Sequence, residues 1–337
     1  MKIIDRQFLS VKTRTCHAST IAFHNNEPVF AWFGGQREGL PDSCIFLQYK
    51  NEIKELGSYI NMPYWNPVLF KVEDELFLSY KVGKFCDCWQ TYILNITDLE
   101  NCKLPDESGR QVIPAGLNFC VKTKPLIIDD IIYCGSSVET SLDWTSYIER
   151  YIYEDGKFEY KDRSRPLTAP KVKYTHESKL YGTRKIMYSQ GIIQPSLFKG
   201  NDDILHAFFR SSGGLENIYH SYCENYTYAD DGWTNPVPLS YSNPNSSVDT
   251  VCMNDRLFLV YNPSPNSRMP LVVDEVKDFN ETVERLVITE EITEEDFTER
   301  GVITPELSYP FMIEQDGKLH LTYTYGRSKI EHVTIEV

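Results

Sequence analysis

The chain has 337 residues, 41% of them hydrophobic and 13% aromatic, which is enough apolar material for a large core. Its formal net charge is −14 and no block of Lys and Arg stands out, so binding to nucleic acid through phosphate neutralisation is not expected. No apolar stretch approaches the length of a membrane span, and we expect no membrane partner. Residues 1–6 lead into no long apolar run, which predicts a cytoplasmic protein; a chain trimmed of its signal would look the same and be periplasmic or secreted.

The cysteines and histidines indicate neither disulfides nor a metal. The nine cysteines are an odd number and are scattered along the chain, as expected for reduced thiols. Cys86 and Cys88 have no second pair to complete a zinc site, and the histidines show no ligand spacing. We therefore predict no metal and no other cofactor.

One hairpin pattern occurs six times in the chain. Each copy has a short polar turn rich in Asn, Asp and Gly, residues that tolerate the left-handed backbone of tight turns, followed by an apolar strand. The six copies are Asn25-Asn26-Glu27-Pro28 before VFAWF, Glu73-Asp74-Glu75 before LFLSY, Asp129-Asp130 before IIYCG, Asn201-Asp202-Asp203 before ILHAFF, Asn254-Asp255-Arg256 before LFLVY, and Gln315-Asp316-Gly317-Lys318 before LHLTYTY.

The strand before each turn begins with a short polar segment. Four of the six contain a Pro, which is tolerated at the first residue of a strand. The segments are His17-Ala18-Ser19-Thr20, Trp65-Asn66-Pro67, Thr123-Lys124-Pro125, Ile193-Gln194-Pro195, Val248-Asp249-Thr250 and Ser308-Tyr309-Pro310.

The repeats predict an all-β fold, a six-bladed β-propeller of four-stranded antiparallel blades. Their spacing of about 50 to 70 residues fits one such blade per repeat. No Pro/Gly/Ser-rich linker interrupts the chain, so residues 1–337 are expected to form a single domain. Lys329 to Glu336 is expected to pair with a strand around Ile3 to Leu9 and close the ring. A β-sandwich, or two all-β domains in tandem, is the alternative, but neither requires the same hairpin six times.

In a propeller the first strands of all blades run the same way along a central channel, so the residues that begin them meet on one face. The antiparallel second strands end on that face. From the strand starts this face would gather His17, Asn66, Lys124, Gln194, Asp249 and Tyr309. From the strand ends it would gather Arg37, Lys81, Ser137 with Glu139, Arg210, Asn262 and Tyr325. So many polar groups in one place predict a functional pocket.

Several motifs resemble the sialidase (neuraminidase) superfamily, and more closely a branch of bacterial and plant sialidase-like proteins with BNR-type repeats. They are CHASTI, WFGGQREG, WNPVLF, CGSSVE, IQPSLF, NPNSSVD, VYNPS and SYPFMIEQDGKLHLTYTY. The Asp-box motif is eroded, and only Asp231-Gly232-Trp233-Thr234 is similar to it.

The resemblance implies a glycoside hydrolase site. The family places three arginines on a substrate carboxylate, an aspartic acid/base, and a tyrosine nucleophile assisted by a glutamate. Arg210 and Arg268 resemble two of the arginines, Tyr309 the nucleophile and Asp42 the acid/base. The third arginine falls on His17 and the glutamate on Gln194, which cannot accept a proton.

Three functions fit the altered site. The first is exo-acting hydrolysis of a terminal acidic sugar, with Glu139 as a substitute base. The second is β-elimination at a uronate, in which His17 or Tyr309 removes the α-proton, since histidine with a pKa near 6.5 suits that step. The third is a non-catalytic glycan-binding propeller with sugar-stacking faces on Trp32, Trp65, Trp89 and Tyr325. An acidic glycan is the expected partner in each case, and the sequence indicates no oligomeric state. The basic segment 163–191 is interpreted as a solvated loop that could arch over one face.

Overall fold

A computed structural model describes residues 1–57, 61–101, 109–140, 143–172, 190–212, 214–226, 232–298 and 301–337, and the backbone of 176–177 and 185–186. The protein is all-β: apart from the short helix α1 (Glu294–Thr298), the regular elements in these ranges are strands. No helix there is long and apolar enough to cross a membrane.

Four antiparallel sheets have four strands each. The first contains β2 (Thr15–His24), β3 (Glu27–Gly35), β4 (Cys44–Tyr49) and β5 (Glu52–Leu56). The second contains β6 (Tyr64–Val72), β7 (Glu75–Val82), β8 (Gln90–Asn95) and β9 (Gln111–Val112). The third contains β20 (Asp249–Met253), β21 (Arg256–Tyr261), β22 (Leu271–Lys277) and β23 (Glu281–Thr289). The fourth contains β24 (Leu307–Gln315), β25 (Lys318–Tyr325), β26 (Lys329–Glu336) and β1 (Lys2–Phe8).

An eight-stranded sheet consists of two further antiparallel units. One unit contains β10 (Leu126–Ile128), β11 (Ile131–Glu139), β12 (Asp143–Glu154) and β13 (Lys157–Arg163). The other contains β16 (Gln190–Lys199), β17 (Leu205–Ser212), β18 (Asn217–Cys223) and β19 (Val237–Ser242). A short parallel pairing of β12 with β16 joins them, where Trp144 faces Gly191. A Cβ on Gly191 would lie 2.1 Å from the Trp144 carbonyl oxygen, so only glycine permits this approach. A separate pair consists of β14 (His176–Glu177) and β15 (Lys185–Ile186).

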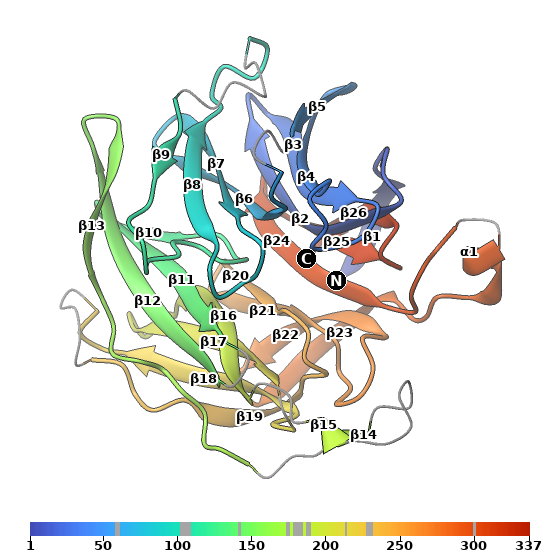
Figure 1. The fold of residues 1–337 in the computed structure, drawn as a ribbon. Coiled ribbons are helices and arrows are strands. Elements are labelled where there is room, and N and C mark those ends of the chain that lie inside the picture. The colour runs from blue at the N-terminus through green and yellow to red at the C-terminus, as the bar shows by residue number, and fades with distance from the viewer. Residues whose placement is uncertain are drawn as a thin grey trace.

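The six predicted hairpins are present, joining β2–β3, β6–β7, β10–β11, β16–β17, β20–β21 and β24–β25. Their turns use left-handed residues, among them Asn25, Asn26 and Asp129. The two terminal segments pair as antiparallel strands, with Lys2 opposite Glu336, so both ends of the chain lie together (Figure 1).

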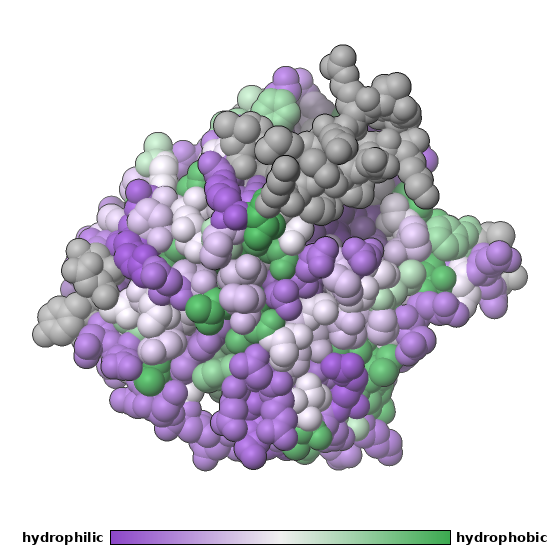
Figure 2. All heavy atoms as spheres, turned by 90° about the horizontal axis from the view of Figure 1, so that it is seen from below, coloured by the Kyte–Doolittle hydropathy of each residue, from purple (hydrophilic) through white to green (hydrophobic). Residues whose placement is uncertain are grey.

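The sheets are arranged around a common centre (Figure 1). Their first strands contact one another there: β2 lies against β6 and β24, and β20 lies against β16 and β24. Apolar side chains fill the spaces between neighbouring sheets, including the fully buried Trp32, which stacks on Phe46. The face in Figure 2 is mainly polar, with apolar side chains scattered over it, as the acidic composition predicts.

A β-bulge interrupts the start of four of these first strands. Pairing with the second strand skips two residues in each, between His17 and Thr20, Trp65 and Val68, Ile193 and Ser196, and Ser308 and Phe311. The first skipped residue has a positive φ in every case: Ala18, Asn66, Gln194 and Tyr309. Bulges of this kind re-aim side chains near functional sites. Phe119 and Asn245 adopt the same left-handed backbone ahead of β10 and β20.

Candidate functional site

Tyr309 lies at the bulge of β24, with a φ of +53° and a proline after it. Bulky residues rarely adopt this conformation, and a following proline disfavours helical backbone further. The strain is of the order of 1–3 kcal/mol and persists only where the surroundings enforce it, as at active sites. Gln194 has the same conformation before Pro195, with a φ of +55°.

The phenol oxygen of Tyr309 accepts two hydrogen bonds. Arg210 Nη1 donates to it at 2.9 Å, and Gln194 Nε2 donates at 3.4 Å. Arg210 Nη1 also donates to Gln194 Oε1 at 3.1 Å, so the three side chains form one network. The Arg210 guanidinium lies 5.5 Å from the centre of the Tyr309 ring and 5.5 Å from that of Trp144. This arrangement stabilises negative charge on the phenol oxygen.

His17 packs against Tyr309, with ring centres 4.0 Å apart. Its Nδ1 is 2.9 Å from Thr324 Oγ1, and its buried Nε2 has no hydrogen-bond partner among the described residues. Burial lowers the pKa of His17 well below its ordinary value, and nearby cations lower it further. These cations are Arg327, Arg268, Arg210 and Lys122. His17 is therefore a neutral imidazole with one free nitrogen.

Two more arginines complete the cluster. Arg268 Nη2 donates to the Asn245 carbonyl at 2.7 Å, while Arg210 Nε donates to the Asn245 side-chain oxygen at 2.9 Å. Asn245 thus links Arg210 to Arg268. Arg268 Nη1 lies 3.3 Å from a Glu306 oxygen, and Arg327 binds the same carboxylate.

Two residues that the sequence analysis did not select, Arg327 and Glu306, also belong to the cluster. The sequence places no third arginine here, yet Arg327, just after β25, supplies one. Burial raises the pKa of Glu306, but Arg268 and Arg327 more than offset this, so its pKa is lowered and it is ionised. Glu38 also binds Arg327. Three guanidinium groups therefore lie with two paired carboxylates, Glu306 and Glu38. The third carboxyl group nearby, Glu139, has a raised pKa, which favours its uncharged form and leaves positive charge for an anion.

Glu139 lies within electrostatic range of Arg210, at the end of β11. Its Oε1 is buried and has no hydrogen-bond partner in the described part of the chain. Burial raises the pKa of Glu139, the positive charge of Arg210 opposes the shift, and Glu38 adds to it. A raised pKa favours the protonated carboxyl group, which suits Glu139 better to act as an acid than as the base expected from the sequence.

Lys124 and Asp249 do not join the cluster, contrary to expectation. Lys124 Nζ donates to both Asp249 oxygens at 2.9 Å, and Asp249 also accepts from the backbone of Met312 at 2.8 Å. Lys124 lines a cavity of about 240 Å³ with residues near the far ends of β2 and β6, such as Phe23 and Lys71. The left-handed residues of these two repeats are Phe119 and Asn245, five and four residues earlier. Lys124 and Asp249 therefore do not occupy the positions that Gln194 and Tyr309 occupy in their own repeats.

The other predicted binding residues have structural partners. Lys81 is fully buried and donates to the Cys120 carbonyl at 2.8 Å. Asn262 donates to three backbone carbonyls, including that of Arg268, and so holds the loop that carries this arginine. Tyr325 donates to Asp296 of α1. These three side chains are therefore committed to the fold.

The remaining candidates lie in exposed or backbone-bonded positions. Asp42 is exposed and accepts the Gln36 backbone N–H at 2.7 Å, so it closes a turn where an acid/base was expected. Arg37 is exposed in the same loop. Asn66 is buried at the bulge of β6. Trp65 is buried and donates to the Gly83 carbonyl. Trp32 is buried as well, so neither ring can stack on a sugar.

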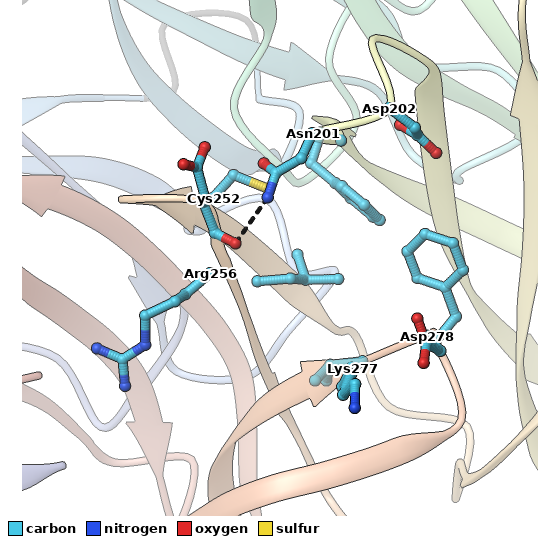
Figure 3. Close-up of a pocket in the computed structure, with 12 residues that line it drawn as sticks. Asn201, Asp202, Cys252, Arg256, Lys277 and Asp278 are labelled. Carbon is cyan, nitrogen blue, oxygen red and sulfur yellow. Dashed lines mark hydrogen bonds between the residues drawn. The ribbon is translucent and has the colours of Figure 1, made fainter.

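Another hollow lies away from the arginine cluster, between the β16–β17 turn and the strands β20 to β22 (Figure 3). It has a volume of about 320 Å³, and the side chains around it include Asn201, Asp202, Arg256, Lys277 and Asp278 (Figure 3). Asp202 is 3.2 Å from His206, and Arg256 is paired with Glu275. Two of its charged groups are thus paired with residues outside its lining, and the hollow contains no cluster of arginines among the described residues.

The described residues assign no metal ligands to the site. No group of three or more His, Cys, Asp or Glu side chains could hold a metal ion within the described ranges. Eight cysteines lie in those ranges and all are free thiols. Residues 173–189 of the basic segment, apart from the backbone of 176–177 and 185–186, lie outside the described residues, as does Asp231 of the eroded Asp-box.

The family model for the BNR repeat-like domain matches residues 29–321. The chain belongs to this family. None of the curated proteins compared by sequence matches it. Among solved structures, a protein of unknown function from Dyadobacter fermentans is similar over 100% of this chain and 99% of its own, with a TM-score of 0.68 and 11% identity.

Two sialidases have a similar fold. A Hadza microbial sialidase aligns with 96% of this BNR repeat-like chain and 66% of its own, with a TM-score of 0.63 and 8% identity. The NanB sialidase from Streptococcus pneumoniae aligns with 100% of this chain and 70% of its own, with a TM-score of 0.61 and 10% identity. At these identities the likeness concerns the fold, a sialidase-like scaffold.

Proposed function

We propose that this protein is a six-bladed propeller enzyme that cleaves the glycosidic bond of a terminal sugar bearing a carboxylate. The observation that carries the proposal is the hydrogen bond from Arg210 to the phenol of Tyr309, next to the Arg268–Arg327 pair. Excess positive charge beside a potential nucleophile fits an anionic sugar. The BNR repeat-like family and the sialidase-like scaffold support the same class of substrate.

Arg268 and Arg327 would hold the substrate carboxylate. A guanidinium presents two parallel N–H donors to a carboxylate, which gives both affinity and orientation. Glu306 fixes both groups from one side. Because burial lowers the pKa of Arg268, an incoming carboxylate also relieves a desolvated cation.

Tyr309 would attack the anomeric carbon. A glutamate that assists the tyrosine is absent, since Gln194 occupies that position. The N–H groups of Arg210 and Gln194 would instead stabilise the negative charge that develops as the phenol loses its proton. A neutral or hydrogen-bonded phenol meets an anionic sugar without the repulsion that a carboxylate nucleophile would experience.

Glu139 would be the general acid in place of Asp42. As the bond between the anomeric carbon and the leaving oxygen breaks, the Glu139 proton passes to that oxygen while the Tyr309 oxygen bonds to the carbon. The phenol proton of Tyr309 would pass to the neutral His17, whose ring packs against Tyr309 and whose Nε2 is free. Water would then displace Tyr309, with the ionised Glu139 accepting the water proton and His17 returning its proton to the departing phenolate. The raised pKa of Glu139 keeps the proton available for the first step.

β-Elimination at a uronate is the second candidate, favoured by the free Nε2 of the neutral His17. The arginines would acidify the proton next to the carboxylate, and His17 would remove it. The leaving oxygen would take a proton from Tyr309 or Glu139 as a carbon–carbon double bond forms. The two reactions differ in their products, because only elimination yields an unsaturated uronate that absorbs ultraviolet light.

A panel of terminal sialosides and glycosyl uronates tests both candidates, with reducing ends and ultraviolet absorbance measured together. We expect new reducing ends without absorbance, and a loss of turnover of at least about 100-fold in Tyr309→Phe. Tyr153→Phe is the matched control, because that hydroxyl binds Glu75 away from the cluster. Absorbance would favour elimination, and binding without turnover would favour a glycan-binding protein. Full turnover in Tyr309→Phe would contradict the assigned site.

A further inference from the structure

Lys122 is a buried lysine that the proposed reaction does not use directly. It lies in the segment that leads into β10, and its side chain is fully buried. Its Nζ donates to the Pro310 carbonyl at 3.1 Å, and it lies 5.8 Å from the centre of the Tyr309 ring and 5.1 Å from that of Phe311. An ammonium group taken out of water is costly, so its retention beside Tyr309 calls for a reason.

We propose that Lys122 is the positioning residue for Tyr309: it holds the Pro310 carbonyl, and with it the left-handed backbone of Tyr309, and it places a positive charge near the phenol. The proposal rests on the proposed function of Tyr309 as the reacting group. The Pro310 carbonyl belongs to the peptide between Pro310 and Phe311, one residue beyond the left-handed Tyr309, and the rigid proline ring connects the two, so the contact restrains the chain next to the strained residue. An unheld backbone could relax and move the phenol away from Arg210.

The charges that face Lys122 come from several elements. Asp249 of β20 raises the pKa of Lys122, whereas Lys124 of its own segment lowers it. On β2, His17 has its own pKa lowered by Lys122. Burial is the largest influence and brings the pKa of Lys122 to about 7. The ammonium is thus charged below about pH 7 and loses its proton as the pH rises through that value.

Lys81 offers a matched control. It is also fully buried and also donates to a backbone carbonyl, that of Cys120, at 2.8 Å. Burial likewise lowers its pKa, to about 8. Within the described part of the chain, the groups that bind Lys81 or shift its pKa are Cys120, Glu149 and Cys134, and not Tyr309, His17 or the arginines. Lys81→Met therefore carries the general cost of losing a buried ammonium without the predicted effect on Tyr309.

The experiment compares Lys122→Met with Lys81→Met in the full chain, with two readouts. With the acidic glycoside that the parent hydrolyses, Lys122→Met should lower kcat about 100-fold and change KM by less than about threefold, because misplacement of a reacting group acts on the chemical step. The fall in parent activity as the pH rises through about 7 should be absent in Lys122→Met. Lys81→Met should keep kcat within about threefold of the parent and keep the pH profile.

The second readout needs no turnover. In protein labelled with 13C at the tyrosine Cζ, the Tyr309 resonance is identified by its absence in Tyr309→Phe. We expect it to move in Lys122→Met and to stay in place in Lys81→Met. Lys122→Gln, which keeps an N–H donor without the charge, serves if Lys122→Met does not fold, and it should shift the resonance as well.

The outcomes separate the two proposals. If the parent turns over no acidic glycan, the proposed function is refuted. If the Tyr309 resonance still shifts between that parent and Lys122→Met, the positioning role stands. An unshifted resonance in Lys122→Met, or an equal effect of Lys81→Met on it, would overturn the positioning role. Unchanged kcat in Lys122→Met of an active parent would overturn it as well.

Discussion

Arg327 and Arg268 share the carboxylate of Glu306, so each depends on the other for its place in the site. Arg327→Ala removes one donor to the substrate carboxylate and leaves Glu306 to neutralise Arg268 alone. Hydrogen bonds to charged groups contribute about 1.5–3 kcal/mol, so we expect affinity for an acidic sugar to fall about 10- to 100-fold. Isothermal titration measures this directly.

The control for that variant is Arg256→Ala, whose guanidinium pairs with Glu275 away from the cluster. It should bind the sugar as the parent does. Equal affinity in Arg327→Ala and the parent would show that Arg327 serves only to hold Glu306 and Glu38.

The titration of Glu139 gives a pH dependence with a definite sign. The pKa of Glu139 is raised by burial, so the protonated acid persists above the ordinary carboxyl value of about 4.3. Activity that needs this proton should be present at low pH and fall as the pH rises through the folded-state pKa. In Glu139→Gln the rate should drop and this limb of the pH profile should disappear, which leaves only the fall through about pH 7 that the charge of Lys122 predicts. A pH profile of Glu139→Gln identical to that of the parent would assign the acid to another group.

At the residue scale, the structure brings together five side chains that the sequence analysis assigned to one site: His17, Gln194, Arg210, Arg268 and Tyr309. Arg327 was not predicted from the sequence, because the resemblance places the third arginine at the position of His17, in a different repeat. Side chains from several sheets converge here, so a cation lost from one repeat can be supplied by another. The signal that could have found Arg327 is its position just after a second strand, like Arg37.

At the scale of elements, two sheets carry a pair of stacked histidines on their second and third strands. His206 Nδ1 is 3.0 Å from His220 Nε2, and His320 Nδ1 is 3.2 Å from His332 Nε2. Burial lowers the pKa of all four, and those of His220 and His332 to about 4. The pairs therefore stabilise the fold above about pH 6.5, and this contribution is lost as the pH falls towards 4.

Denaturant unfolding at pH 7 and pH 5 checks this prediction. For a buried histidine with a folded-state pKa near 4, the free energy of unfolding should fall by about 2 kcal/mol between these pH values. The double variant His220→Gln/His332→Gln cannot take up these protons on unfolding, so its loss should be smaller than that of the parent by up to about 4 kcal/mol. Equal losses in the two proteins would contradict neutral buried pairs.

The six hairpins were predictable from the sequence, because each turn is specified by a few local residues. The positions at which the first strands begin were harder to predict. The prediction that a proline marks the strand start was wrong at Pro67, Pro195 and Pro310, which lie inside β6, β16 and β24 as the second residue of each bulge. Pro125 directly precedes β10 and has no such bulge before it, so the same reasoning misplaced Lys124. Bulge position depends on pairing with the neighbouring strand, and one segment of sequence does not reveal it.

At the scale of the whole molecule, the arrangement of sheets around one centre makes the site. Tyr309, Arg210, His17 and Arg268 come from four different sheets or the loops beside them, and no two are neighbours in sequence. The antiparallel pairing of β1 with β26 joins the two ends of the chain and holds β24 and β25, which carry Tyr309 and lead to Arg327. Periodicity in the sequence predicted this convergence, while the partners of each side chain follow only from the three-dimensional structure.

The central claim is that the arginine cluster recognises a sugar carboxylate. Titration of the protein with an acidic sugar and with its carboxamide, drawn from sialate and glucuronate glycosides, tests it most directly. We expect the acid to bind at least about tenfold more tightly than the carboxamide, and this preference to be lost in Arg268→Ala. Equal binding of acid and carboxamide by the parent, or an unchanged preference in Arg268→Ala, would contradict the account.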